Sequence, residues 1–299
     1  MTPPAHPSST EADAIPGGPA LPGDGGRQAA RERARRAKTR RGQAIAFLSS
    51  VLVLGGLALA VFTSTGWPEV QEQFFSIEQF RDSFPGILSA FWIDVQVFLV
   101  VEVIVLALGL FVAVVRTSTN PALFPFRMLG ALYCDVFRGI PVVLLIYLFG
   151  FGIPALELEG VPTDPLILGS IALTLAYGSY VSEVFRAGIL SIHRTQFESG
   201  LAIGLNRLQT LRHVVLPQAI RRVRPPLLND FIALQKDVAL LAVVGVIEAY
   251  RQAQIDAAAT FNYTPLVAAA LLYLAVTIPM ARLLDYISRP DDPSRGMAK

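Results

Sequence analysis

ESGLAIGLNRLQTLRHVVLP, residues 198–217, is a polar, arginine-containing stretch that lies between two strongly apolar parts of the chain. Its leucines and valines recur at helical spacing, which predicts a helical segment with one apolar face. Gly204 permits a sharp break, and Asn206 with Gln209 three residues later is a pattern that begins a second helix. Pro217 marks the predicted end of that helix. The stretch therefore predicts two short helices joined by a bend.

The composition of the whole chain predicts what surrounds this stretch. Of the 299 residues 53% are hydrophobic and only 16% are charged, which is too apolar for an ordinary water-soluble domain. A bilayer core of roughly 30 Å requires about 20 apolar residues in a helix. The sequence thus predicts an all-α membrane protein with about six transmembrane helices, at 44–64, 92–115, 126–150, 165–189, 228–248 and 263–287.

The N-terminal part is predicted to be a disordered basic tail, residues 1–43, followed by a membrane anchor at 44–64. A run of basic residues, Arg31–Arg41, precedes the apolar segment directly. A cleaved signal peptide has the same order of segments. The apolar segment is of spanning length and lacks a clear cleavage site of small residues, which favours a retained anchor whose N-terminus is cytoplasmic.

Charges in the loops predict the same orientation. Loops 65–91 and 151–164 are mainly acidic and are predicted to lie outside. Segment 190–227 contains six arginines, and the C-terminal tail 288–299 is also basic, so both are predicted to lie inside. Loop 192–226 would then be cytoplasmic, and an amphipathic hairpin lying on anionic lipid headgroups would explain its arginines.

A resemblance gives a second interpretation of this loop. Glu198-Ser199-Gly200, Gly204 and Leu216-Pro217 resemble the cytoplasmic EAA loop of permease subunits of bacterial ABC importers, with Ser199 and Gly200 replacing the usual alanines. Both replacements are small, although glycine weakens a helix by up to about 1 kcal/mol relative to alanine.

Three further segments resemble the polar amino acid uptake family of these importers: DVFRGIP (135–141), YVSEVFRAGI (180–189) and NDFIALQKD (229–237). Val238-Ala239 stands where that family usually has a hydroxylated pair. The resemblance covers residues 90–287, and the first span lies outside it as an added anchor.

The resemblance implies a type I ABC importer permease fold and a subunit that passes glutamate- or glutamine-like substrates. A separate ATPase subunit would bind ATP, because the chain contains no phosphate-binding loop of the G-x-x-x-x-G-K-[ST] type. Other implied partners are an extracellular solute-binding protein, a second permease subunit, same or related, and membrane lipid. We expect no enzyme activity, catalytic residue, cofactor, metal or nucleic acid partner.

Coupling to the ATPase is assigned, through the resemblance, to Glu198, Ser199, Gly200, Gly204, Leu216 and Pro217. Glu198 would cap a helix or form an ion pair at the contact, and Gly204 would make the bend. Leu216-Pro217 would fix the exit from the second helix.

Charged residues within the predicted spans are the candidates for the substrate path: Glu102, Glu183, Lys236 and Asp237. An ionisable group at bilayer depth is costly and usually faces a partner or a cavity. Glu102 would either be hydrogen-bonded within the bundle or contact the amino group of the substrate. Glu183 would either pair with Arg186, three residues away, or serve the path.

Smaller features leave some alternatives. Asp135 and Arg138 are spaced for a mutual ion pair, and the single cysteine, Cys134, is expected to be a small buried residue. A stand-alone secondary transporter or channel is the alternative function, although such chains commonly contain internal repeats and none is found here. A membrane-anchored sensor would not require the bent-helix loop.

Overall fold

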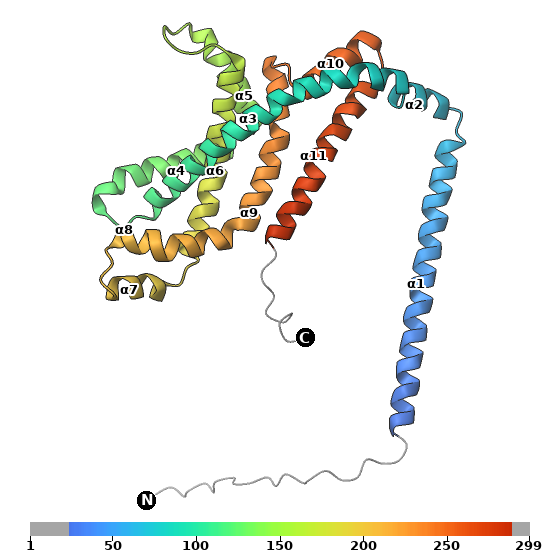
Figure 1. Cartoon of the computed structure of the whole chain (residues 1–299), viewed down its shortest axis with the longest axis horizontal. Helices are drawn as coiled ribbons and strands as arrows, with labels where there is room; N and C mark the ends of the chain where they lie inside the picture. The colour runs from blue at the N-terminus through green and yellow to red at the C-terminus, as the bar shows by residue number, and fades with distance from the viewer. Residues whose placement is uncertain (1–23, 289–299) are drawn as a thin grey trace, which may run out of the picture. The chain divides into compact units, whose positions relative to one another are not determined.

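The structure is a computed structural model that describes residues 24–288, with side chains for 42, 43, 45–284 and 286 (Figure 1). The chain divides into two compact units, Met1–Pro68 and Glu69–Lys299. All regular elements in the described range are helices. The parts of the predicted tails at 1–23 and 289–299 lie outside the described residues.

Helix α1, Asp24–Phe62, forms most of the described part of the first unit. It includes the predicted anchor, and none of the residues of its apolar window Ile45–Phe62 is buried. The helix begins at Asp24, whereas the sequence predicted an irregular tail up to residue 43. Segment 27–41 is rich in alanine, arginine and lysine, which favour helix, so the basic run continues the apolar helix.

The second unit begins within α2, Trp67–Phe74, and continues with α3, Ile77–Thr117. Helix α3 starts 15 residues before the predicted span 92–115, since Ser76 caps it by accepting a bond from the amide of Gln79 at 3.4 Å. Its early residues Ile87 and Phe91 are buried against α10 and α11. At 41 residues the helix is about 60 Å long, which exceeds the bilayer core.

The predicted span 126–150 is broken in two. After a 3₁₀ turn η1, Pro121–Leu123, helix α4 covers Phe124–Gly139 and α5 covers Val142–Tyr147. The two arms are bent by 102°. Pro141 lies between them and excludes a helical conformation at the preceding residue, which explains the break. The π turn η2, Leu148–Gly152, and the 3₁₀ turn η3, Pro154–Leu156, complete the second arm.

Helices α6, Pro165–Leu190, and α11, Thr264–Ser288, agree with the predicted spans 165–189 and 263–287. Asp164 caps α6 by accepting bonds from the amides of Leu166 and Ile167. Both helices are continuous and apolar enough to cross a membrane.

The connection from α6 contains α7, Arg194–Ala202, and α8, Arg207–Thr210. The π turn η4, Leu211–Val215, and α9, Leu216–Asp237, follow without a break. The prediction that Leu216-Pro217 ends the second helix is therefore wrong. Pro217 lies in the first turn of α9, directly after the π turn, where a proline causes the least disruption.

The predicted span 228–248 is also different in the structure. It comprises the end of α9 and a 3₁₀ segment η5, Val238–Val244, and is followed by α10, Ala249–Thr260. Among the described residues, four helices are long and apolar enough to span a membrane, or five if the bent α4–α5 pair is one span.

The core of the second unit lies where α3, α6 and α9 pack together (Figure 1). Val101 and Val105 of α3, Leu173 and Val181 of α6 and Leu234 of α9 are all buried there. A smaller cluster joins the start of α3 to α10 and α11. These two clusters fix the helices that carry the candidate sites.

Candidate functional site

The bent helix pair α7–α8 forms as the sequence predicted. His193 caps α7 by accepting a bond from the amide of Thr195 at 3.4 Å. Gly204 follows α7 with φ +90°, a left-handed conformation that side chains of L-residues rarely adopt. Asn206 and Gln209 form a reciprocal capping box at the start of α8, with both bonds at 2.9 Å.

Gly200 of α7 lies directly against Thr210 of α8. A Cβ atom at this position would lie 2.5 Å from Cγ2 of Thr210, which is fully buried. Alanine, usual at this place in the resembling family, would require Thr210 to move. The sequence analysis did not predict that Thr210 packs against Gly200. The available signal was a β-branched residue ten positions after a glycine that replaces the usual alanine.

The outer side of the pair is exposed. Ser199 is exposed, and Glu198 pairs with Arg194 at 2.8 Å, one turn away on the same helix. Leu201, Ile203 and Leu208, which we call the loop patch, are exposed apolar side chains, with Ile203 at 76% and Leu208 at 69% exposure. Single exposed leucines are ordinary, but three on one short bent segment indicate a contact surface.

Hydrogen bonds link the pair and its continuation to the ends of two long helices. Arg207 of α8 donates to the hydroxyl of Thr119, just after α3. Arg222 of α9 donates to the carbonyl oxygen of Ser191, just after α6, at 2.6 Å. These bonds connect α8 to the end of α3 and α9 to the end of α6.

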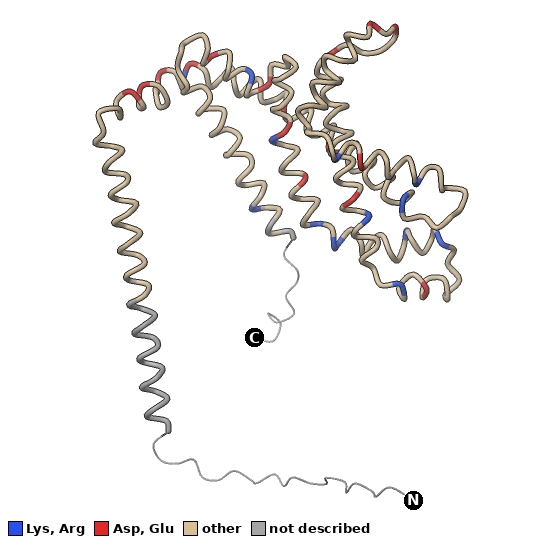
Figure 2. The backbone as a smooth tube through the Cα atoms, turned by 180° about the vertical axis from the view of Figure 1, so that it is seen from behind, with Lys and Arg blue, Asp and Glu red and all other residues tan. Residues whose placement is uncertain are grey.

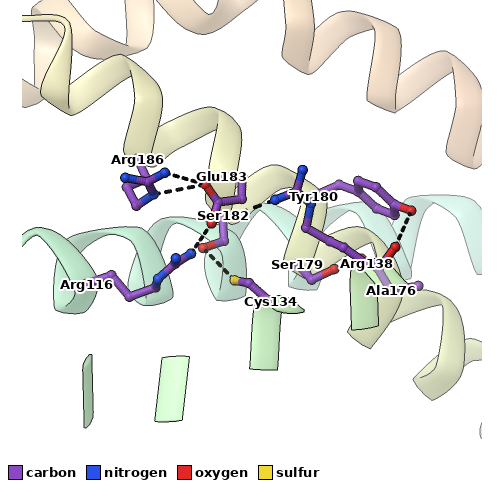
Figure 3. A network of polar contacts seen from close by, with 9 residues as sticks. All are labelled: Arg116, Cys134, Arg138, Ala176, Ser179, Tyr180, Ser182, Glu183 and Arg186. Carbon is purple, nitrogen blue, oxygen red and sulfur yellow. Dashed lines mark hydrogen bonds and ion pairs between the residues drawn. The ribbon is translucent and has the colours of Figure 1, made fainter. Parts of the chain in front are cut away.

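The carboxylate of Glu183 on α6 is surrounded by arginines from three helices (Figure 3). Arg116 of α3 donates to one oxygen, and Arg186 of α6 donates to the other at 2.8 and 2.9 Å. Arg138 of α4 lies 3.9 Å from the first oxygen. We call Arg116, Arg138 and Arg186 the arginine cluster.

The position of Arg138 corrects one prediction. Arg138 lies near Glu183 and over the ring of Tyr180, at 5.7 Å from the ring centroid. Among the described residues no ion pair joins it to Asp135, so the predicted mutual pair is wrong. Cys134, one residue before Asp135, is buried and its sulfur lies 3.6 Å from the hydroxyl of Ser182, in agreement with its expected packing role.

Glu102 of α3 lies in a different environment, because no described residue neutralises it. Its exposure is 9%, and none of the described hydrogen bonds or ion pairs includes its carboxylate. Asp230 lies on α9, which packs against α3. One carboxylate oxygen of Asp230 is buried without a hydrogen-bond partner. The rings of Phe98 and Phe231, at 4.7 Å, join the two helices beside this pair.

The remaining path candidates lie further along α9. Asp237 accepts a hydrogen bond at 2.7 Å from the hydroxyl of Tyr177 on α6, whereas Lys236 is exposed. Glu102 thus lies on α3, and Asp230 and Asp237 lie on α9, two helices that pack with α6, whereas Glu183 belongs to the separate arginine cluster. Sequence reasoning missed Asp230.

A third polar group, also missed, ties α10 to its neighbours. Glu248 is fully buried and caps α10 by accepting bonds from the amides of Tyr250 and Arg251 at 2.7 Å. Its carboxylate also accepts a bond from Tyr273 of α11 at 3.2 Å, and Asp94 of α3 accepts one from the amide of Ala249 at 3.1 Å. Acidic residues at the ends of predicted spans were the available signal.

None of these groups forms a metal site. Within the described part of the chain, no cluster of three or more His, Cys, Asp or Glu side chains could hold a metal ion.

A helical membrane bundle with a bent helix pair on the connection between two of its long helices defines a permease-like transport subunit. The chain belongs to the family described as binding-protein-dependent transport system inner membrane component, whose model matches residues 106–290. The family comprises transport components rather than enzymes, as the sequence predicted.

Two relatives and one solved structure show how far the similarity extends. The chain is 34% identical to the arginine transport system permease protein ArtQ of Bacillus subtilis, over 65% of this chain and 87% of ArtQ. It is 34% identical to the probable glutamine ABC transporter permease protein GlnM of the same organism, over 61% and 82%. A structure titled as an amino acid ABC transporter with histidines is 28% identical to this chain, with a TM-score of 0.61. The match covers 69% of this chain and 94% of that chain.

The comparisons confirm two predictions. The resemblance to permease subunits of the polar amino acid type is confirmed, and so is the fold class, an all-α importer permease.

Proposed function

We propose that this chain is the transmembrane permease subunit of an ATP-driven importer of polar amino acids, which couples a separate ATPase to the passage of substrate. The observation that carries the proposal is the bent pair α7–α8, with its exposed loop patch, on the connection between α6 and α9. The sequence predicted glutamate- or glutamine-like substrates, and the relatives are named for arginine and glutamine. The substrate class common to these is the polar amino acids.

In this proposal the ATPase subunit receives α7 and the loop patch in a groove on its surface. Glu198 and Ser199 lie on the exposed side of α7, where they would meet the partner. Gly200 and Gly204 would fix the angle between the two short helices. Leu216 and Pro217 begin α9 rather than end α8, so they would pass the motion of α8 directly into the bundle.

The substrate path in this proposal follows α3, α6 and α9. Glu102 and Asp237 would lie along it, and Lys236 would reach it from the exposed side of α9. Glu183 would contribute as a fixed group, because both of its oxygens are already engaged by the arginine cluster. Residues 90–287 would form the permease domain, with 192–226 as its coupling loop and 44–64 as an added anchor.

The partners follow from this division of labour. The ATPase would bind ATP, so this chain would need no cofactor of its own. An extracellular solute-binding protein would deliver the substrate, and a second permease subunit, the same or related, would complete the path. Lipid would cover the apolar surface of the spans.

We also propose that the protein lies in a bacterial cell membrane with its N-terminus in the cytoplasm. Arginines gather along α7, α8 and the first half of α9, and acidic residues occupy the loop after α5 (Figure 2). This distribution supports a cytoplasmic coupling loop. A reporter fused at Asn206 should respond as cytoplasmic and one fused at Glu159 as external; the same response at both positions would exclude this topology.

The coupling role is tested at Gly204. Gly204→Val forces a β-branched residue into φ +90° and should change the angle between α7 and α8. Gly160→Val is the matched control, because Gly160 also has a positive φ, +78°, and open space around its Cβ, but lies in the loop predicted to be external. ATP-driven uptake and co-purification of the ATPase should be lost only in the Gly204 variant, at equal membrane levels. Normal uptake by that variant would reject the coupling assignment.

A further inference from the structure

Gly200 takes part in two connections between the short helices α7 and α8. Its carbonyl oxygen accepts a bond from the amide of Leu205 at 3.1 Å, and the amide of Gly204 donates to the carbonyl of Leu201 at 3.0 Å. Bonds of this kind close a helix that ends in a left-handed glycine, as α7 does at Gly204. The position where a side chain of residue 200 would begin faces Thr210 of α8. Gly200 therefore lies both at the bend and at the contact across it.

Thr210 fills the space into which a side chain at position 200 would extend. A Cβ atom there would lie 2.5 Å from Cγ2, 2.9 Å from Oγ1 and 3.2 Å from Cβ of Thr210. Both branches of the threonine face the glycine, so rotation about χ1 would leave one of them in the way. The hydroxyl of Thr210 is buried and has no hydrogen-bond partner within the described part of the chain. The contact is thus one of close packing.

This contact matters for the loop patch because that surface is built from both helices. Leu201, next to Gly200, lies on α7, Leu208 lies on α8 and Ile203 lies in the bend between them. All three apolar side chains are exposed. A partner groove can receive the three together only when the two helices are held at one distance. The smallest residue at position 200 allows the shortest such distance.

We propose that Gly200 and Thr210 are positioning residues for the ATPase, and that their contact holds the loop patch in the shape that fits the groove of this chain's own ATPase partner. This inference rests on the proposed function and adds what determines the fit. Neither residue has to touch the ATPase. Alanine at position 200 would push α8 away from α7 and separate Leu208 from Leu201. The two residues are matched, so a larger residue at one position should be corrected by a smaller one at the other.

The test is a double-mutant cycle on the full-length chain in lipid nanodiscs, titrated with the ATPase subunit that co-purifies with the wild-type chain. Gly200→Ala should raise the Kd for the ATPase about tenfold, within the range that residues in contact show in such cycles. The unfolding midpoint of the permease should stay unchanged, because neither residue belongs to the two buried clusters. Thr210→Ala removes both branches and, combined with Gly200→Ala, should return the Kd to within about threefold of the wild-type value.

Two further variants sharpen the cycle. Gly56→Ala is the matched control, because a Cβ at this helical glycine of α1 meets no atom within 4 Å, and its Kd should equal that of the wild type. Thr210→Val keeps both branches and removes only the hydroxyl that has no described partner, so it should also bind the ATPase as the wild type does.

Other results would overturn the proposal. If Gly200→Ala binds the ATPase as tightly as the wild type does, the contact does not determine the fit, and the proposed function stands. A loss that Thr210→Ala does not correct would mean that position 200 touches the ATPase itself, and a loss in Thr210→Val would assign the contact to the hydroxyl. A midpoint that falls together with the affinity would leave only a structural role. If the wild-type chain binds no ATPase, the proposed function fails as well.

Discussion

Two of the charged groups inside this bundle differ in how completely the chain neutralises them. Around Glu183, three arginines from three helices face one carboxylate, and both of its oxygens accept bonds (Figure 3). Around Glu102 and Asp230 the described residues provide no donor and no positive charge. The first arrangement connects three helices, whereas the second leaves its carboxylates without a neutralising group. Removing the carboxylate of Glu183 should therefore lower stability, and removing that of Glu102 should lower transport.

Glu183→Gln should have the largest effect on stability. It leaves the partly buried guanidinium of Arg116, whose side chain is 13% exposed, without its countercharge, which costs about 3 kcal/mol, the lower end of the range for buried pairs. Thermal unfolding of the purified protein in detergent should show a strongly lowered midpoint. Glu159→Gln controls for the loss of a surface carboxylate. Recovery of part of the midpoint by adding Arg116→Met would tie the effect to the pair, and a wild-type midpoint for Glu183→Gln alone would contradict it.

Tyr177→Phe should have an intermediate effect. The substitution removes the hydroxyl that donates to Asp237 at 2.7 Å, and an unsatisfied buried acceptor costs about 1–3 kcal/mol. Tyr180→Phe is the matched control, since the hydroxyl of Tyr180 makes only a long contact of 3.4 Å with the carbonyl of Arg138. The same unfolding measurement should separate the two variants; equal midpoints would show that the Asp237 contact adds nothing.

Arg138→Gln should cost less, about 0.5 kcal/mol. Its side chain is 44% exposed and lies 3.9 Å from Glu183, a geometry in which ion pairs are weak. The unfolding midpoint should fall only slightly, and the loss should shrink further in high salt because solvent ions screen exposed pairs. A loss as large as that of Glu183→Gln would mean that all three arginines act as one unit.

Glu102→Gln should change stability least. It removes a buried charge that no described residue stabilises, so the unfolding midpoint should stay the same or rise. The expected consequence appears only in uptake. An unfolding midpoint several degrees below that of the wild type would show that Glu102, like Glu183, stabilises the fold. The two carboxylates would then no longer differ in role.

Sequence reasoning succeeded where the signal was local. The continuous apolar helices α6 and α11 begin and end within one residue of prediction, and the bend at Gly204 and the Asn206–Gln209 capping box needed only neighbouring residues. Proline was harder to interpret, because Pro141 breaks a predicted span whereas Pro217 is absorbed at the start of a helix.

The charged site could be predicted only in part, since its character depends on contacts between helices. Glu183 and Glu102 are both glutamates within apolar spans, and the sequence gives no sign that one meets arginines from α3 and α4. Asp230 follows a polar asparagine just beyond loop 192–226, and only the packed structure shows that one of its oxygens is buried without a partner.

The π turn η4 sets the rotational phase of everything that follows it. A π turn holds one more residue than the α turn it replaces, and each residue of a helix advances the side-chain direction by about 100°. If the same residues formed a regular α-helix with none deleted, the extra residue would rotate the side chains of α9 by about that angle relative to α8. Asp230, one of whose carboxylate oxygens is buried, would then face other neighbours without any change in its own identity. The extra residue of the π turn thus sets the direction of a carboxylate about four turns downstream.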